Sequence, residues 1–228
     1  NPTGLTISAE GRRAALDVMM ASASRHPEIG HTLLLDAAYS LYADEPHGWG
    51  ETIVETMEDG TPWPENFLIT YAVSMSKSHT AYGLRTGALI AIHPDQNVTE
   101  RLRGILGVTG RQTWSAAPRL LQYTAAELHS NPETASAWSD ERYRLQGLLI
   151  ERRNAFVEAC EQLNVPINPT HDGFFGWLEH DDPESITEKC AANHVYLVPL
   201  QGGVRIGLCA IPLSSIHRVV ETLQKALN

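Results

Sequence analysis

Apolar positions along the chain fall into two patterns, short continuous runs and longer stretches with helical spacing. Three short apolar runs that end in polar residues predict strands at 31–36, 67–73 and 87–92. Helical spacing, with Ser8 and Ser139 as candidate caps, predicts helices at about 8–25, 95–107, 116–129 and 139–164. Strands that alternate with helices are typical of an α/β fold with a mainly parallel sheet, whose ligands bind beyond the carboxyl ends of the strands.

The pattern of apolar runs changes after Pro166 and Pro169, where the runs become shorter. Shorter strands are predicted there at 174–178, 195–198 and 204–208, with one helix among them and a closing helix at about 213–227. The long helix that precedes this part is a natural connection between two domains. We therefore predict a larger α/β domain within residues 1–140 and a smaller one within residues 141–228.

Composition and charge exclude several classes of protein. Hydrophobic residues make up 43% of the 228 residues and charged residues 19%, which is typical of a globular chain. The net charge of −10 disfavours a nucleic-acid partner, because affinity for phosphate backbones is mainly cationic. No apolar run approaches the roughly 18 residues that cross a membrane. The three cysteines and ten histidines lack disulfide-framework or metal-site spacing, so we expect a cytoplasmic protein without a metal.

The segment 74–87, directly after a predicted strand, carries the clearest chemistry. Lys77 stands there among hydroxyl side chains, and Arg85 follows eight residues later. An aldehyde cofactor with a phosphate requires such a set, because an amine forms a Schiff base with the aldehyde while Ser74 and Arg85 bind the phosphate. Taken alone, the segment also fits a solvated loop with a surface lysine and arginine. His79 fits either a local hydrogen bond or a group that tunes Lys77.

Asp36 and Tyr39 follow an earlier strand and are predicted to lie at the same edge of the sheet as Lys77. A carboxylate that faces a pyridine nitrogen keeps the ring protonated, and a phenol near the ring oxygen tunes the cofactor. Each residue also has a simpler interpretation: Asp36 fits a turn residue at the end of a strand, and Tyr39 fits a half-buried aromatic residue. The pair therefore supports the same cofactor without proving it.

Four motifs in order resemble the pyridoxal-phosphate aminotransferases of fold type I, in particular the aspartate and aromatic aminotransferase class. They are Asn1-Pro2-Thr3-Gly4, Asp36 to Tyr39, Ser74 to Gly87, and Gly203 to Ile206. The resemblance extends over essentially the whole chain, as the C-terminal portion of such an enzyme. It implies the second half of a large domain with a mainly parallel sheet, followed by a small α/β domain.

The resemblance also implies a role for each residue of the candidate site. Lys77 is implied to be the Schiff-base lysine and proton carrier, Asp36 the partner of the pyridine nitrogen, Asn1 and Tyr39 the partners of the ring oxygen, Ser74 and Arg85 the phosphate ligands, and Arg205 the group that holds the substrate α-carboxylate. The implied reaction moves an amino group between an amino acid (aspartate, glutamate or aromatic) and a 2-oxo acid.

Arg111 begins a stretch, Arg111 to Ser115, that resembles the segment whose arginine reaches across a homodimer to a dicarboxylic substrate. The continuation differs from the usual Ser-Asn-Pro-Pro, so a surface arginine that begins a helix remains the alternative. A second departure follows the lysine. Ser78, His79 and Thr80 stand where the family usually has Asn-Phe-Gly.

Parts of such an enzyme are absent from the sequence, namely the first part of the cofactor domain, a small-residue phosphate loop and an aromatic that stacks on the ring. We therefore expect a companion segment, either preceding residues or a second chain. Two other functions stay open: another pyridoxal-phosphate reaction, such as a β-lyase or a decarboxylase, and a non-catalytic domain that senses a ligand. Dependence on a 2-oxo acid separates the first of these from an aminotransferase.

Overall fold

The computed structural model describes residues 1–228, which separate into two compact units. The first, here called the β1–β3 unit, comprises residues 7–41 and 45–139. The second, the β4–β6 unit, comprises residues 1–6, 42–44 and 140–228. The start of the chain therefore groups with its last third, whereas the sequence analysis places residues 1–6 and 42–44 in the larger domain.

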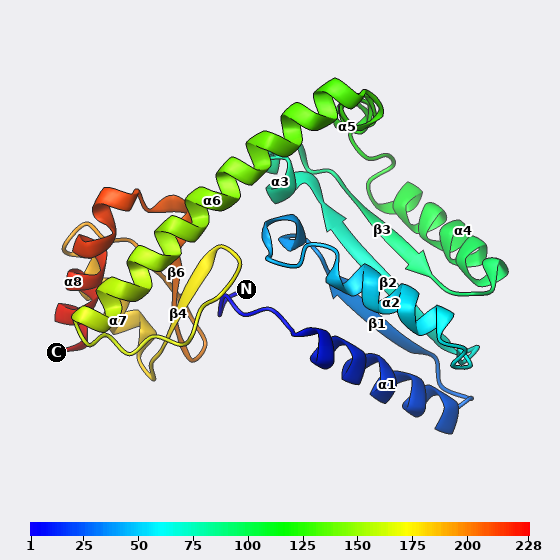
Figure 1. The fold of residues 1–228 in the computed structure, drawn as a ribbon, viewed down its shortest axis with the longest axis horizontal. Helices are drawn as coiled ribbons and strands as arrows, with labels where there is room; N and C mark the ends of the chain where they lie inside the picture. Colours follow the sequence, from blue (N-terminus) through cyan, green and yellow to red (C-terminus); the bar gives the residue numbers. More distant parts are fainter. The chain divides into compact units, whose positions relative to one another are not determined.

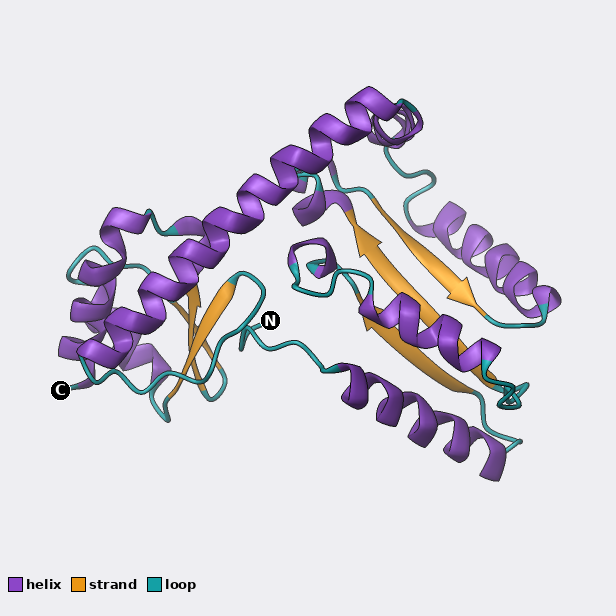
Figure 2. Cartoon of the chain, in the orientation of Figure 1, coloured by secondary structure: helices purple, strands orange, loops and turns teal.

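The β1–β3 unit contains a mixed three-stranded sheet in the order β1-β2-β3 (Figure 2). Its strands are β1 (His31–Asp36), β2 (Phe67–Ser74) and β3 (Gly87–Ile92), and its helices are α1 (Ala9–Arg25), α2 (Gly48–Glu58), α3 (Met75–Ser78), α4 (Gln96–Thr113), α5 (Arg119–Ser130) and the beginning of α6 (Pro132–Gln162). Strand β2 runs parallel to β1 and antiparallel to β3. The direction of β3 was not predicted from the sequence.

The core of this unit lies between helices α1 and α2 and one face of the sheet (Figure 1). Its buried members alternate along the strands, as expected for a sheet covered on one face. They are Leu16, Met20, Ala23, Leu35, Ile53, Phe67 and Ile69. Leu34, whose side chain points to the other face of β1, is 62% exposed. Helix α4 contributes no buried residue.

The β4–β6 unit contains an antiparallel sheet in the order β4-β6-β5. Its elements are β4 (Phe175–Glu179), β5 (Val198–Leu200), β6 (Gly203–Gly207), α7 (Pro183–Ala191), α8 (Ile216–Leu227) and most of α6. Apolar side chains of α6, α7, α8 and the sheet form one core, which includes Phe156, Leu178, Ile186, Val204, Ile206, Val220 and Leu223.

The predicted elements match the structure closely, apart from α2, the single-turn helix α3, the end of α4, which extends to Thr113 rather than 107, the start of α6 and the position of β5. Helix α6 begins at Pro132 rather than 139, because the side chain of Asn131 accepts the amide of Glu133 at 2.9 Å and proline is favourable in a first turn. Strand β5 begins at Val198 rather than 195. Val195 instead closes α7, donating its amide to the carbonyl of Cys190, with His194 at φ 59°. No helix has the length and apolar character needed to cross a membrane.

Candidate functional site

Asp36 and Lys77 lie at the same edge of the β1–β3 sheet. Strands β1 and β2 are parallel, Asp36 pairs with Ala72, and the amide of Ala37 donates to the carbonyl of Ala72 at 2.9 Å. Two residues further, Ser74 ends β2 and caps the single-turn helix α3, which carries Lys77. The carboxyl ends of two parallel strands thus bring a carboxylate and an amine to one rim, where α/β sheets bind ligands.

The carboxylate of Asp36 is exposed and available for a cationic partner. One of its oxygens accepts the amide of Ala38 at 3.0 Å, a turn that fixes the side chain just beyond the strand. It forms no ion pair with any of residues 1–228. A positively charged ring nitrogen of a bound ligand would give this carboxylate an ion-pair partner.

The amine of Lys77 is held by aromatic rings rather than by a carboxylate. Its Nζ atom lies 4.6 Å from the centre of the Tyr82 ring and 5.6 Å from that of Tyr39. Such contacts attract an ammonium but stabilise it by only about 0.5–2 kcal/mol. The amine can therefore leave them for a carbonyl carbon without breaking an ion pair.

Ser74, Ser76 and Arg85 line a depression of about 330 Å³ at the junction of β2 and β3. The hydroxyl oxygen of Ser74 accepts the amide of Ser76 at 3.1 Å. The Nη1 atom of Arg85 donates to the carbonyl of Tyr82 at 2.7 Å and reaches the hydroxyl of Ser76 at 3.4 Å. A guanidinium beside two hydroxyls suits a phosphate. Ser76 was not among the predicted ligands, although its position two residues after Ser74 is the signal that could have identified it.

Asn1 and Arg205 come together within the β4–β6 unit, although 204 positions separate them in sequence. The Nη1 atom of Arg205 donates to the side-chain oxygen of Asn1 at 3.2 Å. The guanidinium also lies 4.5 Å from the centre of the Phe175 ring. Arg205 is only half-buried and has no acidic partner. Its fork of donors remains suitable for a carboxylate.

The predicted site residues are divided between the two units. Asp36, Tyr39, Ser74, Lys77, Arg85 and Arg111 belong to the β1–β3 unit, and Asn1 and Arg205 belong to the β4–β6 unit. Arg111 lies in the last turn of α4 rather than at the start of a helix, and it is exposed. The structure brings the first five together around the end of β2, whereas the side chain of Arg111 makes no hydrogen bond or ion pair within residues 1–228.

A buried arginine fixes the turn at Gly4, and sequence reasoning missed it. The carbonyl of Gly4 accepts the amides of His171 and Asp172 at 2.8 and 2.9 Å. Arg153 donates to the carbonyls of His171 and Gly173 at 3.0 and 2.7 Å, and burial lowers the pKa of its guanidinium. The signal was present in the helical spacing, which places Arg153 in line with buried apolar residues, namely Leu149, Phe156 and Cys160.

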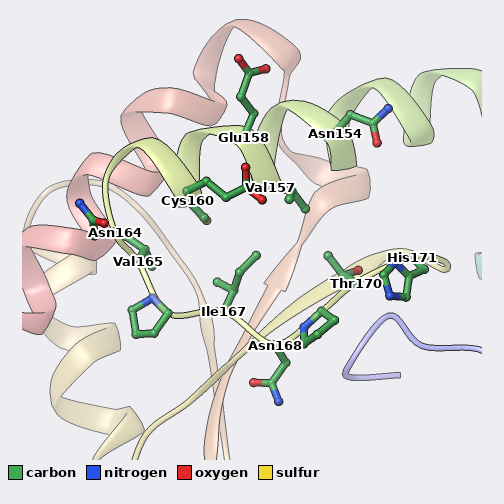
Figure 3. A pocket seen from close by; sticks show the side chains of 13 residues that line it. Asn154, Val157, Glu158, Cys160, Asn164, Val165, Ile167, Asn168, Thr170 and His171 are labelled. Carbon is green, nitrogen blue, oxygen red and sulfur yellow. The ribbon is translucent and has the colours of Figure 1, made fainter.

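A second cavity, of about 930 Å³, lies beside the end of α6 (Figure 3). Its lining includes Asn154 and Glu158 of the helix and, from the segment that follows, Ile167, Asn168 and Thr170. Burial raises the pKa of the nearby Cys160 thiol to about 12, so this thiol is not a nucleophile at neutral pH. None of the predicted site residues lines this cavity.

The family model of aminotransferase class I and II matches residues 1–223. The chain belongs to this family. Over 232 residues it is 24% identical to a cytoplasmic aspartate aminotransferase of Dictyostelium discoideum, covering 100% of this chain and 49% of that protein. It is 29% identical to an aromatic-amino-acid aminotransferase of Paracoccus denitrificans, covering 92% of this chain and 50% of that one.

Solved structures confirm the predicted fold class. An aminotransferase of Anaerococcus prevotii DSM 20548 superposes with a TM-score of 0.90 at 28% identity, covering 100% of this chain and 54% of the other. An aromatic-amino-acid aminotransferase of Burkholderia pseudomallei, solved covalently bound to pyridoxal phosphate, superposes with a TM-score of 0.76 at 20% identity. The chain thus has the fold of fold type I aminotransferases and spans about half the length of the relatives it matches.

Proposed function

We propose that this protein is an aminotransferase that uses pyridoxal phosphate to move an amino group from an amino acid to a 2-oxo acid. The observation that carries the proposal is the grouping at the end of β2: the amine of Lys77 and the carboxylate of Asp36 at one rim, beside the depression lined by Ser74, Ser76 and Arg85. These residues fit the aldehyde, ring nitrogen and phosphate of that cofactor. Membership of the class I and II family supports the same conclusion.

Each residue has a defined task in this proposal. Pyridoxal phosphate, when bound, supplies a carbonyl and an electron sink for the electrons released when a Cα–H bond breaks. Arg85 and the two serines hold the phosphate, and Asp36 keeps a ring nitrogen protonated. The Nζ atom of Lys77 takes the Cα proton and returns it at another carbon. Asn1 and Tyr39 provide polar groups for the ring oxygen.

Arg205 is the proposed ligand of the substrate α-carboxylate, because its guanidinium offers paired donors and is not committed to an acid of its own. Aspartate, glutamate and aromatic amino acids are the proposed substrates, in line with the names of the relatives. Arg111 is proposed to bind a side-chain carboxylate within a homodimer.

The proposal is tested on the native full-length protein supplied with pyridoxal phosphate. Borohydride reduction followed by peptide mass mapping should find one cofactor adduct on Lys77, and aspartate plus a 2-oxo acid should exchange amino and keto groups. Loss of carbon dioxide, or release of a β-substituent without a 2-oxo acid, would instead assign another reaction. Binding of cofactor and amino acid without turnover would assign ligand sensing.

Replacing Arg205 by lysine should raise the KM for amino acids by about 10–100-fold. Lysine keeps the charge but loses the paired hydrogen bonds, and hydrogen bonds to charged groups contribute about 1.5–3 kcal/mol. Steady-state kinetics check this prediction. The borohydride adduct on Lys77 serves as the control and should form as in the wild type, since Arg205 has no proposed contact with the cofactor phosphate. An unchanged KM would remove Arg205 from substrate binding.

Replacing Arg111 by alanine should lower kcat/KM for aspartate by roughly tenfold or more and leave aromatic substrates within about twofold, because only the dicarboxylic substrate has a second charge to bind. Kinetics with both substrates on one preparation measure the ratio. Arg103, exposed in the same helix, provides a matched alanine control. An equal loss for both substrates would show that Arg111 does not determine specificity.

A further inference from the structure

Two histidines and a tryptophan form a cluster beside the turn that carries Lys77. The Nε2 atoms of His79 and His129 lie 2.8 Å apart. The His79 ring stacks on Trp138 at 4.8 Å and an interplanar angle of 18°, and the His129 ring meets Trp138 edge-on at 4.8 Å and 80°. His79 follows α3, His129 belongs to α5 and Trp138 to the beginning of α6. The cluster therefore joins three elements of the β1–β3 unit.

The protons in this cluster can be assigned from donors and acceptors. The hydroxyl of Ser78 donates to the carbonyl of Ser74 at 2.9 Å, because a carbonyl oxygen only accepts. The Ser78 oxygen, 2.7 Å from Nδ1 of His79, must then accept a hydrogen bond from the N–H of that nitrogen. A neutral imidazole has one N–H, so Nε2 of His79 accepts from Nε2–H of His129. All three hydrogen bonds run in one direction, from His129 through His79 and Ser78 to Ser74.

The charge state of His79 supports this assignment of the protons. Burial lowers the pKa of His79, and the neighbouring His129 lowers it further, so His79 is neutral at neutral pH. Protonation of the more exposed His129 leaves the direction of the hydrogen bonds unchanged, since its Nε2–H already donates. Only a second proton, on His79, would place two N–H groups against each other.

The hydrogen-bonded series ends on the turn that presents Lys77. Ser74 is the cap of α3, and its hydroxyl accepts the amide of Ser76 at 3.1 Å. Ser78 reaches back to the carbonyl of the same Ser74, so the series joins the last residue of this four-residue helix to its cap. So short a helix is not stable by itself and depends on outside contacts. The arrangement depends on the side chains of Ser78 and His79, which carry its hydrogen bonds.

We propose that His79 is a positioning residue for Lys77, which ties the turn that presents the amine to α5 and α6 through Ser78, His129 and Trp138. The inference rests on the proposed function for the task of Lys77. A proton carrier must stay within about 3 Å of the atom it serves, and a misplacement of about 1 Å can cost on the order of 10²-fold in rate.

Two substitutions at one position separate the contacts of His79. His79→Phe keeps an aromatic ring to stack on Trp138 but removes both hydrogen bonds. His79→Asn keeps a donor near the place of Nδ1, within reach of Ser78, and loses His129 and most of the stacking. His26→Asn, at an exposed histidine after α1 in the same unit, is the matched control.

The first measurement is hydrogen–deuterium exchange of residues 74–80 in the native full-length protein, which requires no catalysis. We expect exchange about tenfold faster in His79→Phe, an intermediate rate in His79→Asn and the wild-type rate in the control. The second is kinetics, where His79→Phe should lower kcat by about tenfold with KM within twofold, and His79→Asn should recover part of that loss. A general loss of folding would instead speed exchange throughout the unit.

The outcomes distinguish this inference from the proposed function. Wild-type exchange in His79→Phe, or a normal kcat beside an inactive Lys77→Ala, would overturn the positioning role and leave the aminotransferase assignment intact. Equal kcat losses in both His79 variants would also overturn it, because the Ser78 contact would then be irrelevant. Failure of the wild-type protein to form a cofactor adduct on Lys77 would overturn the proposed function, whatever the exchange rates.

Discussion

Replacing Lys77 by alanine should reduce kcat by roughly 10²–10⁴-fold or more and abolish the borohydride-stable adduct. The amine is the only group on the rim of β1 and β2 that can both react with a carbonyl and carry a proton, and general acid–base groups contribute about that factor. Rapid-mixing kinetics of a half-reaction, followed by intact mass, measure both effects.

The chain offers a clean control for this experiment. Residues 1–228 contain three lysines, Lys77, Lys189 and Lys225, and peptide mass mapping distinguishes an adduct on Lys77 from one on either of the others. Lys225 is exposed in the last turn of α8, and Lys225→Ala should retain wild-type kcat and adduct. Lys77→Arg keeps the positive charge beside the tyrosine rings and should be as inactive as Lys77→Ala. Substantial turnover in either Lys77 variant would contradict the proposed mechanism.

The candidate site was predictable from the sequence where its residues are local. Lys77, Ser74 and Arg85 lie within twelve positions, and the strand before them is an apolar run that both sequence and structure end near residue 74. Asp36 was predictable for the same reason, because parallel strands bring their carboxyl ends to one edge.

Contacts between distant residues were not predictable in this way. The hydrogen bond between Asn1 and Arg205 joins opposite ends of the sequence, and the His79–His129 contact spans 50 positions. Periodicity describes which face of an element is buried but not which element covers it. Family resemblance supplied a role for Asn1 and Arg205 yet none for His79, where the chain departs from the family pattern.

Helix α2 shows why the spacing of hydrophobic residues does not predict every helix of this chain. Two of its first three residues, Gly48 and Gly50, disfavour a helix, and its buried face carries Thr52 and Thr56 in place of apolar side chains. Both threonine hydroxyls donate to helix carbonyls at 2.7 Å, and Arg12 of α1 donates to Thr52 at 3.2 Å. The buried threonines are therefore satisfied by hydrogen bonds within the helix and by one with Arg12 of α1, which no hydrophobic pattern reveals.

Replacing Gly4 by alanine should destabilise the β4–β6 unit by roughly 2–5 kcal/mol, combining steric overlap with backbone strain. Gly4 has φ 71°, and a Cβ there would overlap the Thr170 hydroxyl and the carbonyl oxygen of Phe175. Thermal unfolding should show the loss as a fall in Tm of roughly 5–15 °C. The carbonyl of Gly4 also accepts the amides of His171 and Asp172, so relief by a shift of the turn would break those bonds.

Gly173→Ala separates the two causes, because Gly173 has nearly the same φ, 69°, but open space where a Cβ would lie. It should cost only the strain, about 1–2 kcal/mol. Equal Tm values for the two variants would show that the overlap at Gly4 is relieved without cost. Since Asn1 is three residues before Gly4 and bonds to Arg205, a displaced turn should also raise the KM for amino acids in Gly4→Ala but not in Gly173→Ala. The glycine of the first motif is thus expected to link the stability of the unit to the placement of Arg205, the proposed ligand of the substrate α-carboxylate.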